Sequence, residues 1–367
     1  MARRLPDKRL KAAGARRLGN ESFFSAPQVK RSVRPHHRLG EVKGVEMKIA
    51  YLDHNHWIQL ARAYHGKVDD PVLVRVLRIL QTAIASDQLA LPLSAVHYME
   101  AARKANTGAR MRLGVVMWEL SRGLTLASYR AILTHELEMA LAKRLPQVRP
   151  AAFTLLSRGA AHAFGMDPRP YRVPTEVGAR LPQETIDRLE EIGTAIIERA
   201  LVVGHAPSGE RVPVFGITEY NKRFQEYLRA LPARLSQLPL DKWTDALYAI
   251  SIVDILDVLN EVMARHDLYA DQVAVSGDDF RALVDDLPSR RVDLQLHQQV
   301  VRNPNLQPKL NDLEDWAGLA PAAAHCDVLV CEKHFANLLL RGGFVPRATV
   351  LTDVRALPVA LGLDTAA

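Results

Sequence analysis

The chain has few of the features that mark secreted, membrane-spanning or nucleotide-cofactor proteins. Only two of its 367 residues are cysteine, too few for the disulfide framework that stabilises small secreted domains. No apolar run reaches the roughly 20 residues that a membrane helix needs, and we see no secretory signal peptide. Phosphate-binding loops, dinucleotide fingerprints and nucleophile elbows are also missing. We therefore expect a reduced, cytoplasmic protein without membrane association.

Excess positive charge is lacking over most of the sequence. Residues 1–46 contain twelve Lys or Arg against four Asp or Glu, a net charge of +8, whereas the whole chain carries +7. The body is therefore nearly neutral, and its charge does not argue for nucleic-acid binding. We expect residues 1–46 to form a disordered basic extension, or to precede a true start at Met47. The alternative is an arm that binds phosphate backbones.

Short apolar runs that are typical of buried strands occur near both ends of the chain, and helical periodicity dominates between them. The expected strands are residues 47–52, 89–93, 328–330 and 348–351. The expected helical stretches are residues 109–145, 183–230, 243–268, 312–325 and part of 288–308, with 146–182 irregular and 231–241 a linker containing two prolines.

These patterns predict one α/β domain assembled from two distant parts of the sequence. Residues 47–105 and 309–360 would form the α/β domain, and residues 106–308 a large, mostly α-helical insertion. The insertion could regulate access to a site, bind a partner or inhibitor protein, or mediate homo-oligomer formation.

Acidic residues stand at or just past the ends of the expected strands. Asp53 follows the first strand, Glu100 lies in the helix after the second, and Glu332 follows the third. Asp312 and Asp315 begin the helix that leads into the third strand. Ligands of open α/β sheets bind outside the carboxyl ends of the strands. Clustered carboxylates repel one another unless a cation joins them, and oxygen donors suit Mg²⁺ or Mn²⁺. The pattern favours a metal-dependent hydrolase of phosphodiesters.

Four segments together resemble the PIN domain, a Rossmann-like α/β/α ribonuclease fold with a parallel sheet. They are residues 51–53, 94–100, 311–315 and 326–333, and more narrowly they are similar to a group of large bacterial PIN-like proteins. Two departures stand out: the helical middle is much longer than in a minimal PIN domain, and Glu332 stands where Asp is commoner. The resemblance implies a nuclease that uses Mg²⁺ or Mn²⁺ to cut single-stranded RNA, with DNA as the alternative substrate. A toxin, an antiphage defence effector or an RNA-processing enzyme would be its setting.

Within this hypothesis each acid has a role and a plainer alternative. Asp53 would be the central metal ligand, or simply the N-cap of the next helix. Asp315 and Glu332 would complete the metal site, and Glu100 would position a second ion or the attacking water. Asp312 could be a ligand, a group behind the ligands, or a helix cap. The alternative for Glu100 is an ion pair with a neighbouring basic residue.

Basic and thiol side chains near these acids allow further interpretations. Arg103, Lys104, Arg110 and Arg112 could line the rim of an RNA groove, but we favour a solvated helix face as the explanation of their spacing. His54, Asn55 or His56 could touch a substrate phosphate beside Asp53. Cys326 and Cys331 flank a strand, which is too wide a spacing for a zinc site, and we expect both thiols to be buried.

Two other functions remain open on the sequence. One is a catalytically inactive PIN-like scaffold that binds nucleic acid or protein, and the other is a metal-dependent phosphatase or nucleotide hydrolase with the same acids.

Overall fold

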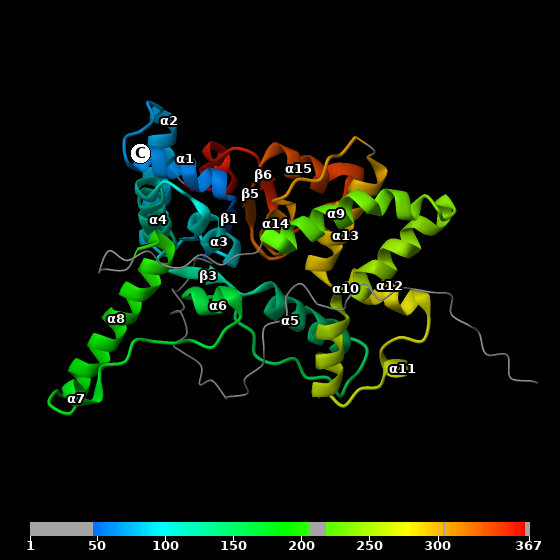
Figure 1. Ribbon diagram of the computed structural model, residues 1–367, viewed down its shortest axis with the longest axis horizontal. Helices are drawn as coiled ribbons and strands as arrows, with labels where there is room; N and C mark the ends of the chain where they lie inside the picture. Colours follow the sequence, from blue (N-terminus) through cyan, green and yellow to red (C-terminus); the bar gives the residue numbers. More distant parts are fainter. Residues whose placement is uncertain (1–46, 206–217, 304, 364–367) are drawn as a thin grey trace, which may run out of the picture. The chain divides into compact units, whose positions relative to one another are not determined.

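The structure is a computed structural model that describes residues 47–205, 218–303 and 305–363 (Figure 1). The expected basic extension, residues 1–46, lies outside the described residues. None of the described helices is both long enough and apolar enough to cross a membrane. The described chain is mostly helical, with a small parallel sheet.

Four parallel strands form that sheet in the order β2-β1-β5-β6. The apolar runs at both ends of the sequence supply them, as predicted. The strands are β1 (Lys48–Leu52), β2 (Leu89–Ala90), β5 (Val328–Val330) and β6 (Thr349–Leu351). Strands β1 and β5 are central, so segments almost 280 residues apart lie side by side.

The register of β1 and β5 fixes where their downstream residues emerge. Leu52 lies opposite Val330, and the backbone N–H of Asp53 donates to the Val330 carbonyl at 2.8 Å. Both strands therefore end at the same edge. At the opposite edge, the Asp327 carboxylate accepts the Ile49 N–H at 2.8 Å, which places Asp327 at the start of β5 and away from that edge.

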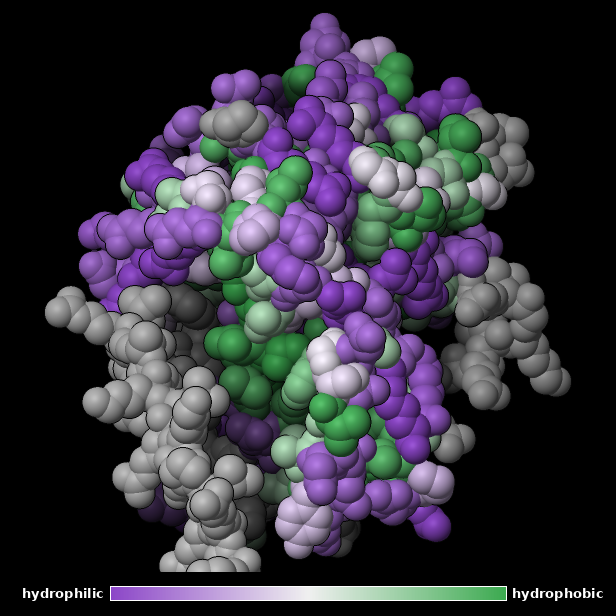
Figure 2. Space-filling view, turned by 90° about the vertical axis from the view of Figure 1, so that its right-hand side faces the viewer, coloured by the Kyte–Doolittle hydropathy of each residue, from purple (hydrophilic) through white to green (hydrophobic). Residues whose placement is uncertain are grey.

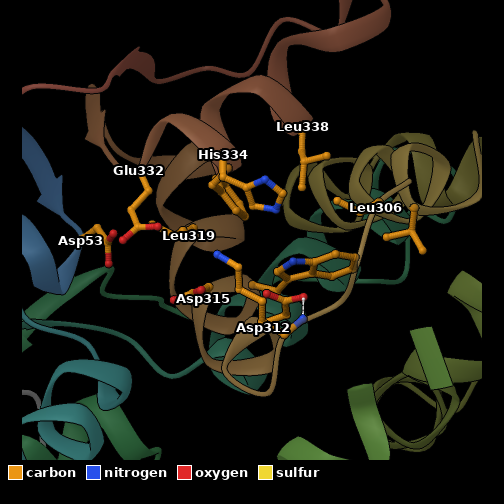
Figure 3. Close-up of a pocket in the computed structure, with 12 residues that line it drawn as sticks. Asp53, Leu306, Asp312, Asp315, Leu319, Glu332, His334 and Leu338 are labelled. Carbon is orange, nitrogen blue, oxygen red and sulfur yellow. Dashed lines mark hydrogen bonds between the residues drawn. The ribbon is translucent and has the colours of Figure 1, made fainter. Parts of the chain in front are cut away.

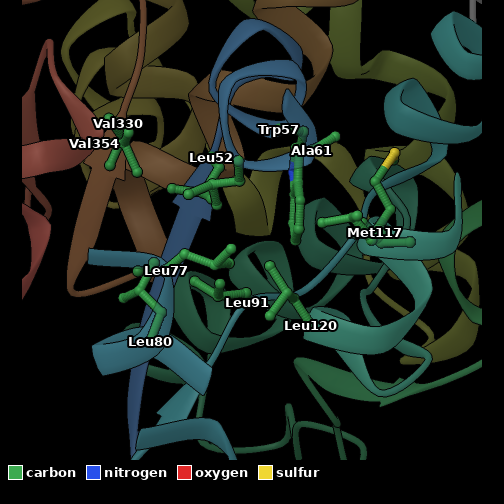
Figure 4. Packing of buried hydrophobic residues seen from close by; sticks show 14 of the residues in the cluster. Leu52, Trp57, Ala61, Leu77, Leu80, Leu91, Met117, Leu120, Val330 and Val354 are labelled. Atoms are coloured by element: carbon green, nitrogen blue, oxygen red, sulfur yellow. The ribbon is translucent and has the colours of Figure 1, made fainter. Parts of the chain in front are cut away.

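Helices bury both faces of the sheet because successive strand residues point to opposite sides. On one face Leu52 and Val330 pack with Trp57, Leu80 and Met117 (Figure 4). The helices on this face are α1 (His54–Tyr64), α2 (Pro71–Ala85) and α4 (Thr107–Ser121).

On the other face Tyr51 and Leu329 pack in a second cluster that contains Trp316, Leu319 and Phe335. The elements of this face include α13 (Pro288–Arg302), α14 (Asp312–His325) and α15 (Lys333–Leu340).

The prediction of continuous helix over residues 109–145 was wrong. Helix α4 ends where Arg122 and Gly123 adopt left-handed conformations, with φ of 53° and 71°. Strand β3 (Leu124–Leu126) follows, and α5 (Tyr129–Ala142) begins after it. β3 pairs antiparallel with β4 (Leu156–Arg158), which lies in the stretch predicted to be irregular. A three-residue apolar strand cannot be told from helix by periodicity alone.

Strand β3 also touches the parallel sheet. Leu93 and Thr125 form a parallel bridge: Leu93 N–H donates to Leu124 O at 2.9 Å, and Leu126 N–H donates to Leu93 O at 2.8 Å. Strand β3 is therefore hydrogen-bonded to the segment that follows β2.

Helix α9 (Thr218–Leu235) was also mispredicted, since it runs through Pro232 into the expected linker. Leu231 and Leu235 are buried in a third apolar cluster. Tertiary packing here outweighs the cost of proline inside a helix. The same cluster joins α5, α10 (Trp243–Arg265), α12 (Gly277–Asp285) and α13.

Two further helices, α3 and α8, remain among the longer elements. Figure 2 shows one face that is largely hydrophilic, apart from scattered hydrophobic side chains and a larger hydrophobic group below the centre of the view. The remaining bounds are α3 (Ala95–Arg103), α6 (Ala160–Phe164), α7 (Thr175–Gly178), α8 (Gln183–Val203), α11 (Ala270–Val273), α16 (Leu357–Ala360), and the 3-10 turns η1 (Leu240–Lys242), η2 (Arg341–Gly343) and η3 (Val354–Ala356).

Candidate active site

Asp53 and Glu332 stand beside each other at the carboxyl edge of the central strands. Each residue occupies the N-cap position of the helix that follows its strand, Asp53 before α1 and Glu332 before α15. An Asp53 carboxylate oxygen accepts the His54 N–H at 2.6 Å. The Asn55 side-chain amide donates to the Glu332 carboxylate. Two carboxylates from different strands thus face one space, as Figure 3 shows.

Helix α14 brings two more acids to this space. Asp312 and Asp315 lie in its first turn, one turn apart and on one face. The Asp312 carboxylate accepts the Lys309 N–H at 2.7 Å. One pocket is lined by Asp53, Asp312, Asp315 and Glu332. The structure therefore places four of the five predicted site residues around a common pocket.

The fifth, Glu100, approaches from α3 without lining that pocket. Its carboxylate lies 3.4 Å from Nδ1 of His54. Burial lowers the pKa of His54 to about 3, so this imidazole is neutral at ordinary pH. The contact is therefore not a charged ion pair, and Glu100 is not neutralised by it.

Burial and mutual repulsion raise the pKa of three of these carboxyl groups. Desolvation is the largest cause for each. It raises the pKa of Asp53 to about 6, with Glu332 adding to the effect. The pKa of Asp315 rises to about 7, helped by the charge of Asp53. That of Glu100 rises to about 8, with Asp315 and Asp53 contributing. Each of the three is raised further by the charge of another acid at this edge, so a nearby cation would stabilise all three charged forms.

The donors suit a hard divalent cation, but they do not form a complete shell. All are carboxylate oxygens, the ligands that Mg²⁺ and Mn²⁺ prefer. Across the described ranges, no three His, Cys, Asp or Glu side chains are arranged to hold one metal ion together. Mg²⁺ usually keeps several waters and needs only one or two protein carboxylates. The residues present fit such a loosely held ion rather than an all-protein cage.

Two of the expected rim residues have other roles. Arg110 is 1 % exposed, and its guanidinium donates to the Ala102 carbonyl at 3.3 Å. It therefore cannot line an RNA groove. Arg103 pairs with the buried Glu314, which also accepts from Asn221 at 2.6 Å. This network ties α3 to α14 and to α9. Lys104 is half-buried and Arg112 is exposed.

Lys309 and His334 also line the pocket, and sequence reasoning had not placed either in this site. Their only signal was proximity along the chain: Lys309 is three residues before Asp312, and His334 two after Glu332. The two thiols are free and buried, as predicted.

Comparison of the chain with protein-family models, curated proteins and solved structures gave no match. The chemistry of the site is therefore inferred from its geometry alone.

Proposed function

We propose that this chain is a Mg²⁺- or Mn²⁺-dependent endoribonuclease with a PIN-like fold, which hydrolyses phosphodiester bonds of single-stranded RNA. One observation carries the proposal. Asp53 and Glu332 follow adjacent parallel strands in register, and Asp315 points into the same space. A phosphodiester carries negative charge and would not approach these acids without a cation between them.

The strand order supports a doubly wound arrangement. With the Leu93–Thr125 bridge counted, the order is β3-β2-β1-β5-β6. If β4 is left aside, this is the order of the first five strands of the Rossmann fold. In such sheets the ligand binds where the strand order reverses. Here the reversal lies between β1 and β5, the strands that lead into Asp53 and Glu332.

The roles of the residues follow from their surroundings. Asp53, rigid at its strand end, would hold the metal together with Asp315 and Glu332. When bound, the metal would activate water and offset the charge that develops on the phosphate. Glu100 approaches from α3 and would orient the attacking water. Burial and the charges of Asp315 and Asp53 raise the pKa of Glu100, and a bound cation would lower it again and favour the charged carboxylate.

Cleavage of end-labelled single-stranded RNA tests the proposal directly. The wild type, Asp53→Asn and Asp278→Asn are compared in Mn²⁺ and in EDTA. Asp278 has a side chain that is 90 % exposed and serves as the control. We expect Mn²⁺-dependent cutting by the wild type and the control, and at least a hundredfold loss with Asp53→Asn.

The alternative is a PIN-like binding scaffold without catalytic activity. Among the described residues, no three His, Cys, Asp or Glu side chains are arranged to hold one metal ion, and this favours the scaffold. No cleavage, together with a melting temperature that Mn²⁺ leaves unchanged, would support this alternative. Cleavage of nucleotides or aryl phosphates but not of RNA would instead indicate a phosphatase.

A further inference from the structure

The acids at the carboxyl edge of the sheet are arranged in a row. Asp315 lies between Asp53 and Asp312 (Figure 3). The charges of Asp53 and Asp312 both raise the pKa of Asp315, which agrees with this placement. At the Asp53 side of the row, the Glu100 carboxylate lies 3.4 Å from Nδ1 of His54. The row therefore has a Glu100 end and an Asp312 end.

A lysine stands at the Glu100 end of the row. Lys104 is the C-cap residue of α3 and follows Glu100 by four positions, a spacing that makes residues neighbours on a helix surface. The charge of Lys104 lowers the pKa of Glu100 and of His54, so its ammonium group is near both. The adjacent Arg103 is instead held by the buried Glu314. Lys104 is therefore the cation that this end of the site can offer to a substrate.

A second lysine stands at the Asp312 end. Lys309 is exposed and lines the acidic pocket. Its backbone N–H donates to the Asp312 carboxylate at 2.7 Å, which fixes where the side chain begins. The charge of that side chain lowers the pKa of Asp312 and of Asp315. The row of acids thus has one lysine near each end, from different elements of the fold.

The two lysines keep their charges available. Within the ranges that the structure describes, the ammonium groups of Lys104 and Lys309 make no ion pair within 4 Å. Lysines that served only to offset the charge of the acids would contact them. A lysine is a point charge on a flexible stem and commonly binds phosphate. A polynucleotide that crossed the row with one phosphate at the metal would carry further phosphates past each end, where these lysines lie.

We propose that Lys104 and Lys309 bind the two phosphates that flank the scissile one, so that the RNA strand crosses the acids from α3 to the segment between α13 and α14. This inference rests on the proposed nuclease function and names the part of the substrate that the site recognises beyond the cleaved bond. A mononucleotide has no flanking phosphates, so the two lysines would favour polymers. Phosphate contacts carry no sequence information directly, so this pair would act on any base sequence.

Dinucleotides with an extra phosphate at one end distinguish the two flanks. The competitors are UpU, pUpU with its extra phosphate at the 5′ end, and UpUp with its extra phosphate at the 3′ end. Fluorescence anisotropy would measure how well each displaces a labelled oligouridylate of eight nucleotides, in EDTA to separate binding from cleavage. The variants are Lys104→Gln and Lys309→Gln. Lys67→Gln is the matched control, because Lys67 is exposed and follows the end of α1 that lies away from the acids.

Each variant should affect one flank only. Lys104→Gln should weaken binding of one phosphorylated dinucleotide by roughly threefold or more, and Lys309→Gln should do the same to the other. Binding of UpU should be unchanged in both. For the octanucleotide, each substitution should reduce the slope of log Kd against log salt concentration by about 0.7, the value for one contact with a single strand. The control should match the wild type, and circular dichroism melting would verify that each variant folds.

Two results would overturn the proposal. One is an equal loss for pUpU and UpUp in both variants, which would show that the lysines only add to a diffuse positive potential. The other is octanucleotide binding that is absent in the wild type or unchanged in both variants.

The outcome is independent of whether the protein cleaves. Losses specific to one flank, without cleavage of RNA in Mn²⁺, would refute the nuclease and keep the phosphate sites. Cleavage with an unchanged KM in both lysine variants would keep the nuclease and refute the phosphate sites.

Discussion

The imidazole of His97 joins the start of helix α3 to the end of β1, with Nε2 2.8 Å from the carbonyl oxygen of Leu52. Its Nδ1 accepts the Ser94 N–H at 2.9 Å. Because Nδ1 must be unprotonated to accept, the ring is neutral and carries its proton on Nε2. This contact positions the helix of Glu100 against the strand that ends at Asp53.

Protonation of His97 should therefore destabilise the fold. Burial lowers the pKa of His97 from 6.5 to about 4, so as the pH falls the unfolded chain takes up this proton first. The stability that the neutral ring contributes is present above about pH 6.5 and lost towards pH 4, up to about 3 kcal/mol.

Urea unfolding from pH 7.5 to 4 would measure that loss, with His97→Gln as the comparison. The site carboxyl groups with raised pKa values make both proteins more stable as the pH falls. Subtracting the free energy of unfolding of one protein from that of the other removes this shared contribution. If both proteins show the same pH dependence, His97 does not titrate as expected.

Asp53→Asn should stabilise the metal-free protein while abolishing its response to metal. Asparagine keeps an oxygen for the His54 N–H but removes a carboxylate whose pKa is raised to about 6. At pH 8 the gain in free energy of unfolding should be about 1–3 kcal/mol.

Urea unfolding in EDTA gives the first quantity, and the rise in melting temperature with Mn²⁺ gives the second. Asp278→Asn should behave as wild type in both. A variant that is less stable and still responds fully to Mn²⁺ would exclude Asp53 as the central ligand.

Arg103→Ala should destabilise the fold by about 2–3 kcal/mol, because Glu314 would remain buried without its cation. The Arg103 side chain is 33 % exposed whereas that of Glu314 is fully buried, so the loss is smaller than for a fully buried pair. Chemical denaturation would measure it.

Two further variants test this explanation. Glu314→Gln in the Arg103→Ala background should recover part of the loss, because the buried charge is gone. Arg172→Ala removes a 74 % exposed partner of Glu190 and should cost under about 1 kcal/mol. No recovery by Glu314→Gln would mean that Arg103 acts through packing instead.

Gly318 sets the distance between α14 and β1. A Cβ atom there would lie 2.6 Å from the Tyr51 hydroxyl, which makes a 2.8 Å hydrogen bond with the Ser94 hydroxyl. We expect Gly318→Ala to cost about 1–3 kcal/mol and to weaken Mn²⁺ binding, because Asp315 lies on the same helix.

Gly277→Ala is the matched control, because a Cβ there meets nothing within 4 Å. Thermal unfolding and Mn²⁺ titration of both variants would give the comparison. Equal stability of the two variants would show that Tyr51 and α14 adjust freely.

The strand ends and their acids could be predicted because β1 and β5 are short and mostly apolar, and an acid follows each within two residues. Strand β3 could not, since Leu124–Leu126 continues the helical periodicity of its neighbours and is set apart only by the left-handed turn at Arg122 and Gly123. Pro232 suggested a break that burial of Leu231 and Leu235 overrides.

The roles of individual acids were harder to predict from the sequence, because they depend on partners from distant segments of the chain. Glu314 and Asp315 are adjacent, yet one is sealed in an ion pair with Arg103 and the other faces the pocket. Helical spacing groups Asp312 with Asp315. Only the partners contributed by distant segments, Arg103 and Asn221, decide what Glu314 does.

The position of β5 between β1 and β6 sets when this site can exist during synthesis. The contact between Ile49 and Asp327 spans 278 residues, and Glu332 follows still later. Most of the chain would have been synthesised before β5, the second neighbour of β1, could pair with it. The same delay leaves one edge of β1 exposed for much of translation, when unpaired strands are prone to aggregate.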